Sequence, residues 1–245
     1  MKRSINIMLI SLVTTMTLVS SSCKKDNGPT GAGAAALTIV NAMPASSPII
    51  ANINNQLPYF ISQISVPYGS AQLYRFAGGN TSVSLTQSSD TTNHVFQGSS
   101  FNLTVNTVHS FFISGNVLSP DTLLVEDILN SPAGHPGPSD STTEIRFVNL
   151  SAGSSPISIN IQGNANGSEV NSLQYRSITE FKSYDATSSI ANYTFEFRDQ
   201  GTGNLLATYF LDGVNAAFNT VLFKNLTIVF AGDSGSQTTF LVNNW

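Results

Sequence analysis

Cysteine, tryptophan and charged residues are scarce in this sequence, which contains one Cys, one Trp and only 10% charged residues. Because Cys23 is the sole cysteine, no intrachain disulfide can form, so any core is held by burial of apolar side chains alone. The 10 Lys and Arg residues form no basic run longer than two residues. Nucleic acid is therefore excluded as a partner, because a phosphate-binding surface needs clustered cations.

Residues that could carry catalysis are also few. The three histidines, His94, His109 and His135, have a spacing that matches neither a metal site nor a catalytic triad. The chain also lacks a Gly-x-Ser-x-Gly elbow, a His-Glu-x-x-His motif and a phosphate-binding glycine loop. The closest acidic pair, Glu126 and Asp127, occupies adjacent strand positions and so points to opposite faces. We predict that the protein is not an enzyme and uses no cofactor or metal.

Residues 1–22 have the layout of a bacterial secretion signal that ends at a lipid-modified cysteine. Two basic residues precede an apolar run from Ile5 to Val19, and three serines separate this run from Cys23. The run is shorter than the roughly 20 residues that a membrane-spanning helix needs. Residues 22–26 resemble the start of lipoproteins from Bacteroidetes-type bacteria. We predict lipidation of Cys23 and membrane anchoring in the cell envelope, at the outer membrane of a Gram-negative bacterium.

The rest of the chain alternates apolar and polar residues. Every second residue is apolar in Phe101–Val105, Ile157–Ile161 and Tyr193–Phe197. A period of two predicts strands with one face in a core and the other in water. We find no convincing apolar stripe with the 3.6-residue period of a helix. The sequence therefore predicts an all-β protein.

Short segments recur in the same order in the two halves of the chain. Leu37–Asn41 matches Ile145–Asn149 at an offset of 108, and Ser46–Ile49 matches Ser154–Ile157 at the same offset. Later matches have an offset of 117, which loop insertions between strands explain. An internal repeat of this kind predicts two tandem β domains.

A stretch rich in proline and glycine separates the two repeats. Three prolines and two glycines in residues 131–139 oppose a continuous strand and favour an extended linker. Each repeat has room for roughly seven to nine strands, as in an immunoglobulin-like or transthyretin-like β-sandwich. In the second core we expect Phe147, Phe181, Phe195, Phe197, Phe210 and Phe230. The predicted segments are a signal peptide at 1–22, a flexible tether at 23–36, a first sandwich at 37–130, a linker at 131–143 and a second sandwich at 144–245.

The repeated motifs resemble a known bacterial family. Each half has a strand that ends in Val-Asn, at Val40–Asn41 and Val148–Asn149, followed by a Ser-Pro loop, an isoleucine-rich strand and later a Tyr. This order resembles the envelope family called domain of unknown function 4397. The family's usual Gly after the Tyr is Gly69 in the first half but is replaced by Arg176 in the second. The resemblance implies a tandem β-sandwich lipoprotein and brings no established catalytic residues.

The repeated asparagines and prolines have a structural interpretation. Asn side chains bond nearby backbone groups at turns, so Asn41 and Asn149 are expected to end the first strand of each half. Pro48 and Pro156 are expected at strand entries, because proline cannot donate to a central ladder.

Two functional classes remain open. The first is a non-enzymatic envelope lipoprotein that binds another envelope protein, a surface polymer or a host ligand through its loops. The alternative is an accessory carbohydrate-binding lipoprotein of a glycan-uptake system, which requires an exposed aromatic strip. Tyr59, Phe60, Tyr68 and Tyr74 form the densest aromatic group away from the strongest predicted core strands and are the candidate ligand surface.

Three tripeptides suggest O-glycosylation. Asp90-Thr-Thr92, Asp121-Thr-Leu123 and Asp140-Ser-Thr142 resemble the sites at which Bacteroidetes-type bacteria attach O-glycans to exported proteins. The candidate acceptors are Thr91, Thr122 and Ser141.

Overall fold

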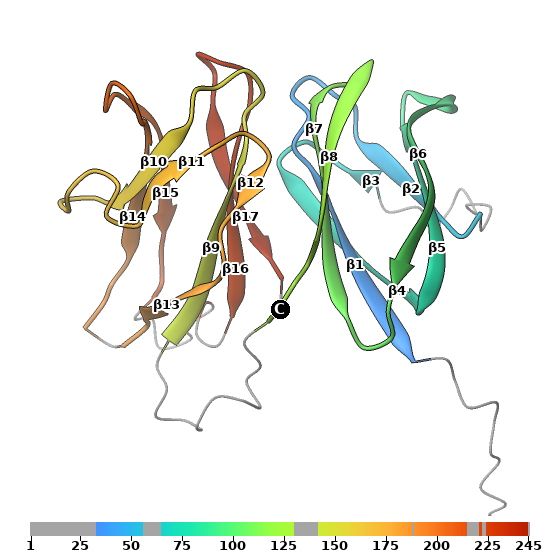
Figure 1. The fold of residues 1–245 in the computed structure, drawn as a ribbon, viewed down its shortest axis with the longest axis horizontal. Helices are drawn as coiled ribbons and strands as arrows, with labels where there is room; N and C mark the ends of the chain where they lie inside the picture. Colours follow the sequence, from blue (N-terminus) through green and yellow to red (C-terminus); the bar gives the residue numbers. More distant parts are fainter. Residues whose placement is uncertain are drawn as a thin grey trace, which may run out of the picture. The chain divides into compact units, whose positions relative to one another are not determined.

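The computed structural model describes residues 33–55, 65–129, 142–187, 189–214, 221 and 224–244. These residues form strands joined by turns and contain no helix, so the all-β prediction is confirmed. Accordingly, this part of the chain holds no helix able to cross a membrane. Figure 1 shows the strands, which are β1 (Ala34–Asn41), β2 (Ile49–Ile53), β3 (Ser65–Val66), β4 (Ser70–Ala77), β5 (Gly79–Gln87), β6 (Asp90–Leu103), β7 (Val108–Asn116), β8 (Ser119–Glu126), β9 (Thr142–Leu150), β10 (Ile157–Ile161), β11 (Val170–Leu173), β12 (Ser177–Ile178), β13 (Lys182–Asp185), β14 (Tyr193–Asp199), β15 (Leu205–Leu211), β16 (Asn225–Ala231) and β17 (Thr238–Asn243).

Strands β1 to β8 form the two sheets of the first half. Sheet A has the order β4-β1-β7-β8, and sheet B has the order β3-β2-β5-β6. Alternate side chains of the two sheets meet in one core, where Leu37 and Ile39 of β1 pack with Val83 and Leu85 of β5. All four are completely buried, as expected for two sheets that face each other across a sandwich.

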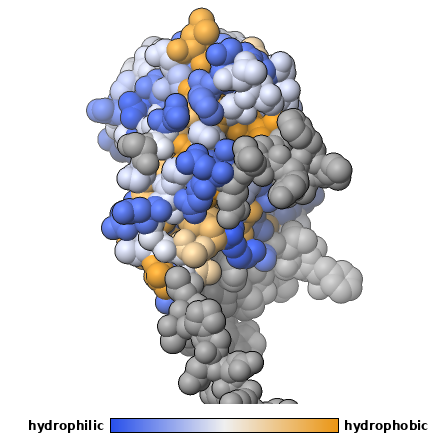
Figure 2. Space-filling view, turned by 90° about the vertical axis from the view of Figure 1, so that its right-hand side faces the viewer, coloured by the Kyte–Doolittle hydropathy of each residue, from blue (hydrophilic) through white to orange (hydrophobic). Residues whose placement is uncertain are grey.

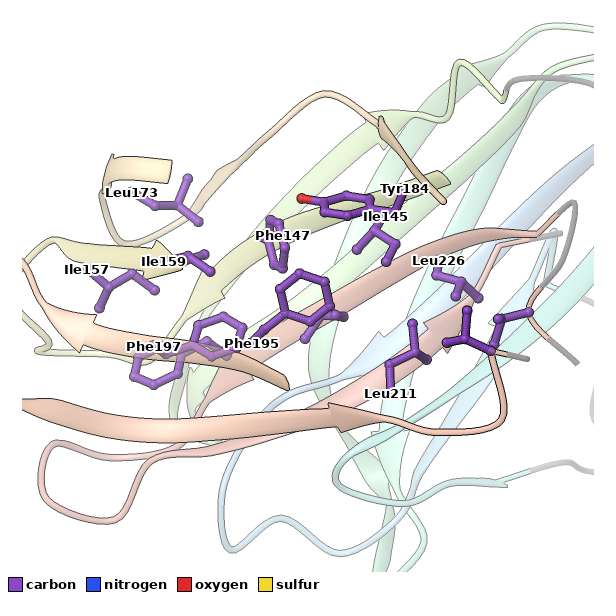
Figure 3. Close-up of a cluster of buried hydrophobic side chains, with 14 of the residues drawn as sticks. Ile145, Phe147, Ile157, Ile159, Leu173, Tyr184, Phe195, Phe197, Leu211 and Leu226 are labelled. Atoms are coloured by element: carbon purple, nitrogen blue, oxygen red, sulfur yellow. The ribbon is translucent and has the colours of Figure 1, made fainter. Parts of the chain in front are cut away.

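Strands β9 to β17 form the second half. Sheet C has the order β12-β9-β16-β17, with β13 also paired to β9, and sheet D has the order β11-β10-β14-β15. Figure 3 shows the core between them, where the ring centroids of Phe147 and Phe195 lie 5.2 Å apart. The prediction is wrong for Phe181 and Phe210, because the Phe181 ring lies against the guanidinium of Arg146 and the Phe210 side chain is 55% exposed. Phe210 pairs with Thr194, one position away from the inward-facing pair Phe195 and Tyr209.

The two halves have the same strand order. In each, the first strand lies at the centre of its sheet and pairs in parallel with the last strand but one, as β1 does with β7 and β9 with β16. The single difference is that β12 and β13 together take the place of β4 beside the first strand. The repeat seen in the sequence therefore recurs in the topology.

Sheets A and C pack against each other through the faces that point away from the two cores. Residues 33–245 accordingly form one compact unit. A third apolar cluster joins the sheets and consists of Val40, Ala42, Phe112, Val148, Leu150, Val229, Ala231 and Val242. The central strands are thus covered on both faces, and every residue of β16 is buried.

The Asn prediction is confirmed by the turns after β1 and β9. The Oδ1 atom of Asn41 accepts a hydrogen bond from the backbone N–H of Met43, and Asn149 accepts the equivalent bond from Ser151. The Nδ2 atoms of both asparagines donate to backbone carbonyls of the following strand region, those of Val66 and Leu173. These bonds end the first strand identically in both halves.

Several predicted boundaries shift. Strand β1 begins at Ala34, so residues 34–36 belong to the sheet and not to a flexible tether. Strand β9 begins at Thr142, two residues before the predicted second sandwich. Strand β6 ends at Leu103, and Val105 lies in the following turn with 42% of its surface exposed. The signal peptide, Cys23 and the linker residues 131–139 lie outside the described residues.

Candidate binding groove

A groove lies over β5 and β6 on the face of sheet B that points away from the core. Its volume is about 340 Å³, and its lining consists of Asn55, Ser82, Val83, Ser84, Gln97 and Gly98. Along β5, Ser82 and Ser84 alternate with core residues, so their side chains point outward. Figure 2 shows the side of the molecule that carries β5 and β6, where hydrophilic and intermediate colours cover most of the coloured surface.

Strand pairing brings three polar side chains into one row across this face. Asn52 of β2 pairs with Ser84 of β5, which in turn pairs with Gln97 of β6. The row lies beside a turn in which Asn54 and Asn55 both have positive φ, and the Oδ1 atom of Asn54 accepts a hydrogen bond from the backbone N–H of Ser82. Asparagine tolerates this left-handed conformation better than most residues, so it places the Asn55 amide at the rim.

The side-chain oxygen of Asn52 is buried and has no hydrogen-bond partner among the described residues. An unsatisfied buried acceptor costs roughly 1–3 kcal/mol, but Asn52 is not itself among the residues that line the groove. The residues that line the groove carry hydroxyl and amide groups and no ionisable side chain. Such groups both donate and accept hydrogen bonds, and the groove therefore suits a neutral ligand rich in hydroxyl or amide groups.

On the equivalent face of the second half, polar side chains of the chain hydrogen-bond to one another. Asn160 and Glu196 pair as Asn52 and Ser84 do, and the Nδ2 atom of Asn160 donates to Oε2 of Glu196 over 2.8 Å. Arg198 donates to the same oxygen, also over 2.8 Å. These hydrogen bonds, that from Arg198 being the stronger, lower the pKa of Glu196. Asn160 is only 1% exposed.

The Oδ1 atom of Asn160 is likewise buried without a hydrogen-bond partner among the described residues, so an unpaired asparagine oxygen is common to both halves. Ser84 stands where the second half has Glu196, and Thr86, which pairs with Ile50, stands where the second half has Arg198. Ser84 is nevertheless as buried as its equivalent, with 9% of its surface exposed against 8% for Glu196. The two repeats therefore differ in the charge of the side chains beside the asparagine on this face.

The predicted aromatic surface does not coincide with the groove. Tyr74 packs against the first core, and burial raises its pKa to about 12. Tyr68 lies in the turn before β4, with its ring edge towards Phe240 of β17 at a centroid distance of 6.5 Å. Tyr59 and Phe60 lie outside the described residues, so the ligand surface built on them stays a prediction.

The histidines are not brought together. His94 is exposed on β6, and His135 lies outside the described residues. His109 is buried, with Nδ1 3.3 Å from Oγ1 of Thr107 and Nε2 3.9 Å from Oε2 of Glu126. No group of three or more His, Cys, Asp or Glu side chains able to hold a metal ion occurs in the part of the chain that the structure describes.

The glycosylation candidates differ in exposure. Thr91 is exposed on β6, beside Asp90, whose carboxylate accepts hydrogen bonds from Thr92. Thr122 is half-buried on β8, and its carbonyl accepts a bond from Arg176. Ser141 lies outside the described residues, and modification of all three sites stays a prediction.

A buried polar network between sheets A and C was not predicted. Glu126 and Asp127 do point to opposite faces, as expected, but Asp127 is buried against Arg146 of the second half. Nη2 of Arg146 lies 2.5 Å from Oδ1 of Asp127, and its Nε donates to Oγ1 of Thr227 over 2.8 Å. The guanidinium carbon also lies 4.4 Å from the ring centroid of Phe181.

The other carboxylate oxygen of Asp127 completes the network. Oδ2 accepts hydrogen bonds from Oγ of Ser110 over 2.8 Å and from Nδ2 of Asn244 over 3.1 Å. Oγ1 of Thr227 donates to Oδ1 of Asn244 over 2.6 Å. Two residues of the first half and three of the second thus form one hydrogen-bonded cluster, which connects the halves.

A second, more exposed polar contact lies elsewhere between the two halves. The Tyr175 hydroxyl donates to Oδ2 of Asp121 over 3.0 Å, and Nη1 of Arg176 lies 3.3 Å from Oδ1 of the same carboxylate. Arg176 has a positive φ of 59°, the conformation that Gly69 adopts in the first half. This strained backbone places the guanidinium against the first half.

Comparison with known proteins finds no family model that matches the chain and no curated protein that matches it.

Proposed function

We propose that this chain is a non-enzymatic lipoprotein of the cell envelope that binds a neutral surface polymer or envelope partner through the groove of sheet B. The observation that carries the proposal is a groove whose polar lining consists of uncharged hydroxyl and amide groups. A ligand rich in hydroxyl or amide groups can exchange hydrogen bonds with this lining, whereas a strongly charged ligand finds no counter-charge in it.

The proposed architecture is two tandem β-sandwich domains of the transthyretin-like alternative. An immunoglobulin sheet places its first, second, fifth and fourth strands side by side. Here the first strand pairs with the fourth and the seventh, which favours the other alternative. The repeated Val-Asn and Ser-Pro motifs support membership of the family called domain of unknown function 4397.

The proposed location follows from the sequence alone. A basic start, a short apolar run and three serines precede Cys23, so we infer cleavage after residue 22 and lipidation of Cys23. Stable anchoring by acyl chains requires more than one chain, as a diacylated and N-terminally acylated Cys23 would provide. We place this anchor in the outer membrane.

A screen of envelope polymers tests the binding proposal. The detergent-solubilised lipoprotein is immobilised and exposed to purified polysaccharides and peptidoglycan fragments, and affinity is measured by biolayer interferometry. Gln97→Arg fills the groove, and Thr208→Arg, at the equivalent register position of β15, is the matched control. We expect Gln97→Arg to weaken binding at least tenfold and Thr208→Arg to leave it unchanged. Equal affinity of both variants, or no binding by the wild type across the panel, would overturn the groove proposal.

The carbohydrate-uptake alternative gives a different result in the same screen. It requires an aromatic platform, and the candidates are Tyr59 and Phe60. Loss of glycan binding in Tyr59→Ala with Phe60→Ala, together with full binding by Gln97→Arg, would favour this alternative over the groove.

A further inference from the structure

The interface between sheets A and C relates repeat-equivalent residues to one another. Strand register aligns Ser110 with Thr227 and Asp127 with Asn244, because Ser110 pairs with Val125 as Thr227 pairs with Val242. Asn244 donates to Oδ2 of its own equivalent, Asp127. Contact between a residue and its equivalent on the partner is the mark of a two-fold, isologous interface.

The rest of the interface follows the same two-fold pattern. The apolar cluster contains equivalent residues from both halves, such as Val40 with Val148 and Phe112 with Val229. The repeated tyrosines also behave reciprocally, because Tyr68 of the first half contacts β17 and Tyr175 of the second half contacts β8. Each half therefore presents nearly the same face to the other.

Charge breaks this symmetry at two buried positions. Arg146 of the second half stands where the first half has Thr38, and Asp127 of the first half stands where the second has Asn244. All four side chains are buried. Pairing of a first half with a second half thus brings one carboxylate and one guanidinium together with neutral partners.

The other two pairings are electrostatically unfavourable. Two first halves in the same geometry would bury two Asp127 carboxylates together, opposite Thr38 and without a guanidinium. Two second halves would bury two Arg146 guanidiniums beside Asn244, with the exposed Glu180 as the carboxylate that acts on each in place of the buried Asp127. Buried charges without a counter-ion are strongly destabilising, and like charges in contact add to the cost.

We propose that the sheet A and sheet C faces form a charge-coded recognition surface, whose partner is the complementary half and which rejects a copy of the same half. The apolar cluster supplies attraction that does not distinguish between the halves, whereas Asp127 and Arg146 supply the specificity. Other specific interfaces use the same combination, in which general attraction holds the partners together and repulsive elements exclude the wrong partner. The proposal does not depend on what the groove binds.

The test uses the full chain, folded first and then cut at a protease site inserted between residues 131 and 139. The cut protein is incubated to allow exchange of halves, and the pairs are identified by native mass spectrometry. For the wild type we expect pairs of one first and one second half. In Asp127→Asn with Arg146→Thr, both halves carry the neutral residues of their equivalents, and we expect pairs of identical halves to increase at least tenfold.

Asp121→Asn with Arg176→Gly is the matched control, because it removes the exposed ion pair between the halves and leaves the buried network intact. Exposed pairs contribute little, so we expect less than a threefold change in pair composition. Identical-half pairs at comparable abundance in the cut wild type would overturn the proposal, as would dissociation of the cut wild type into single halves. Exclusive pairing of unlike halves in the double Asp127 and Arg146 variant would also overturn it.

Discussion

Asp127→Asn removes one charge from the buried network between sheets A and C and keeps almost the same side-chain shape. In the Arg146–Asp127 pair the two side chains are 3% and 0% exposed. A hydrogen bond to a charged group contributes roughly 1.5–3 kcal/mol, and the new amide nitrogen would face the donors of Ser110 and Asn244, which loses roughly another 1 kcal/mol. With a buried cation left uncompensated, we expect a total loss of about 3–5 kcal/mol in the free energy of unfolding.

Urea unfolding followed by circular dichroism measures this loss. Arg146→Met, which leaves Asp127 unpaired, is expected to be destabilised by a similar amount. Asp127→Leu combined with Arg146→Met is expected to lose less than either single variant, because two apolar side chains replace the whole pair. A loss below about 1 kcal/mol for Asp127→Asn, the value typical of a solvent-exposed pair, would show that the buried pair contributes no more than an exposed one.

Three further predictions concern the core and the titrating groups. Phe195→Ala is expected to cost about 3–5 kcal/mol in urea unfolding, because Phe195 is fully buried, whereas Phe210→Ala on the exposed face is expected to cost below about 0.5 kcal/mol. Glu196 has a lowered pKa, so its stabilising effect is present above pH 4.5 and is lost as the pH falls through its folded-state pKa. Glu196→Gln should therefore be less stable than wild type at pH 7, and the difference in the free energy of unfolding should shrink as the pH is lowered. Tyr74 has a raised pKa of about 12, so its neutral form stabilises the fold below pH 10 and this contribution is lost as the pH rises through about 12. Burial raises the pKa of other tyrosines as well, Tyr184 among them, so the phenolate absorbance of Tyr74→Phe should lack one of several late-titrating groups.

The alternation of apolar residues predicted the strands that have one wet face. In β14, Phe195 and Phe197 are buried in the core as the period of two requires. The same period could not reveal that sheets A and C cover each other. A strand that is covered on both faces shows instead a continuous run of buried residues, as Leu226–Ala231 does.

The sequence alone could not predict the features that depend on strand register. Asn52, Ser84 and Gln97 meet only because three strands pair at particular positions, and a shift of one residue would send each side chain to the opposite face. Likewise, the sequence predicted that Asp127 points away from Glu126, but the position of Arg146 opposite Asp127 follows from how the two halves pack.

The proposed cell-envelope location depends on the lipid anchor at Cys23, and intact-mass analysis of the protein from native cells tests it. We expect the mature chain to begin at Cys23 and its N-terminal peptide to carry acyl chains. Cys23→Ala is the control, and it should remain unprocessed and unlipidated. A native chain that retains residues 1–22, or that carries an unmodified Cys23, would overturn the proposal of a lipid-anchored envelope protein.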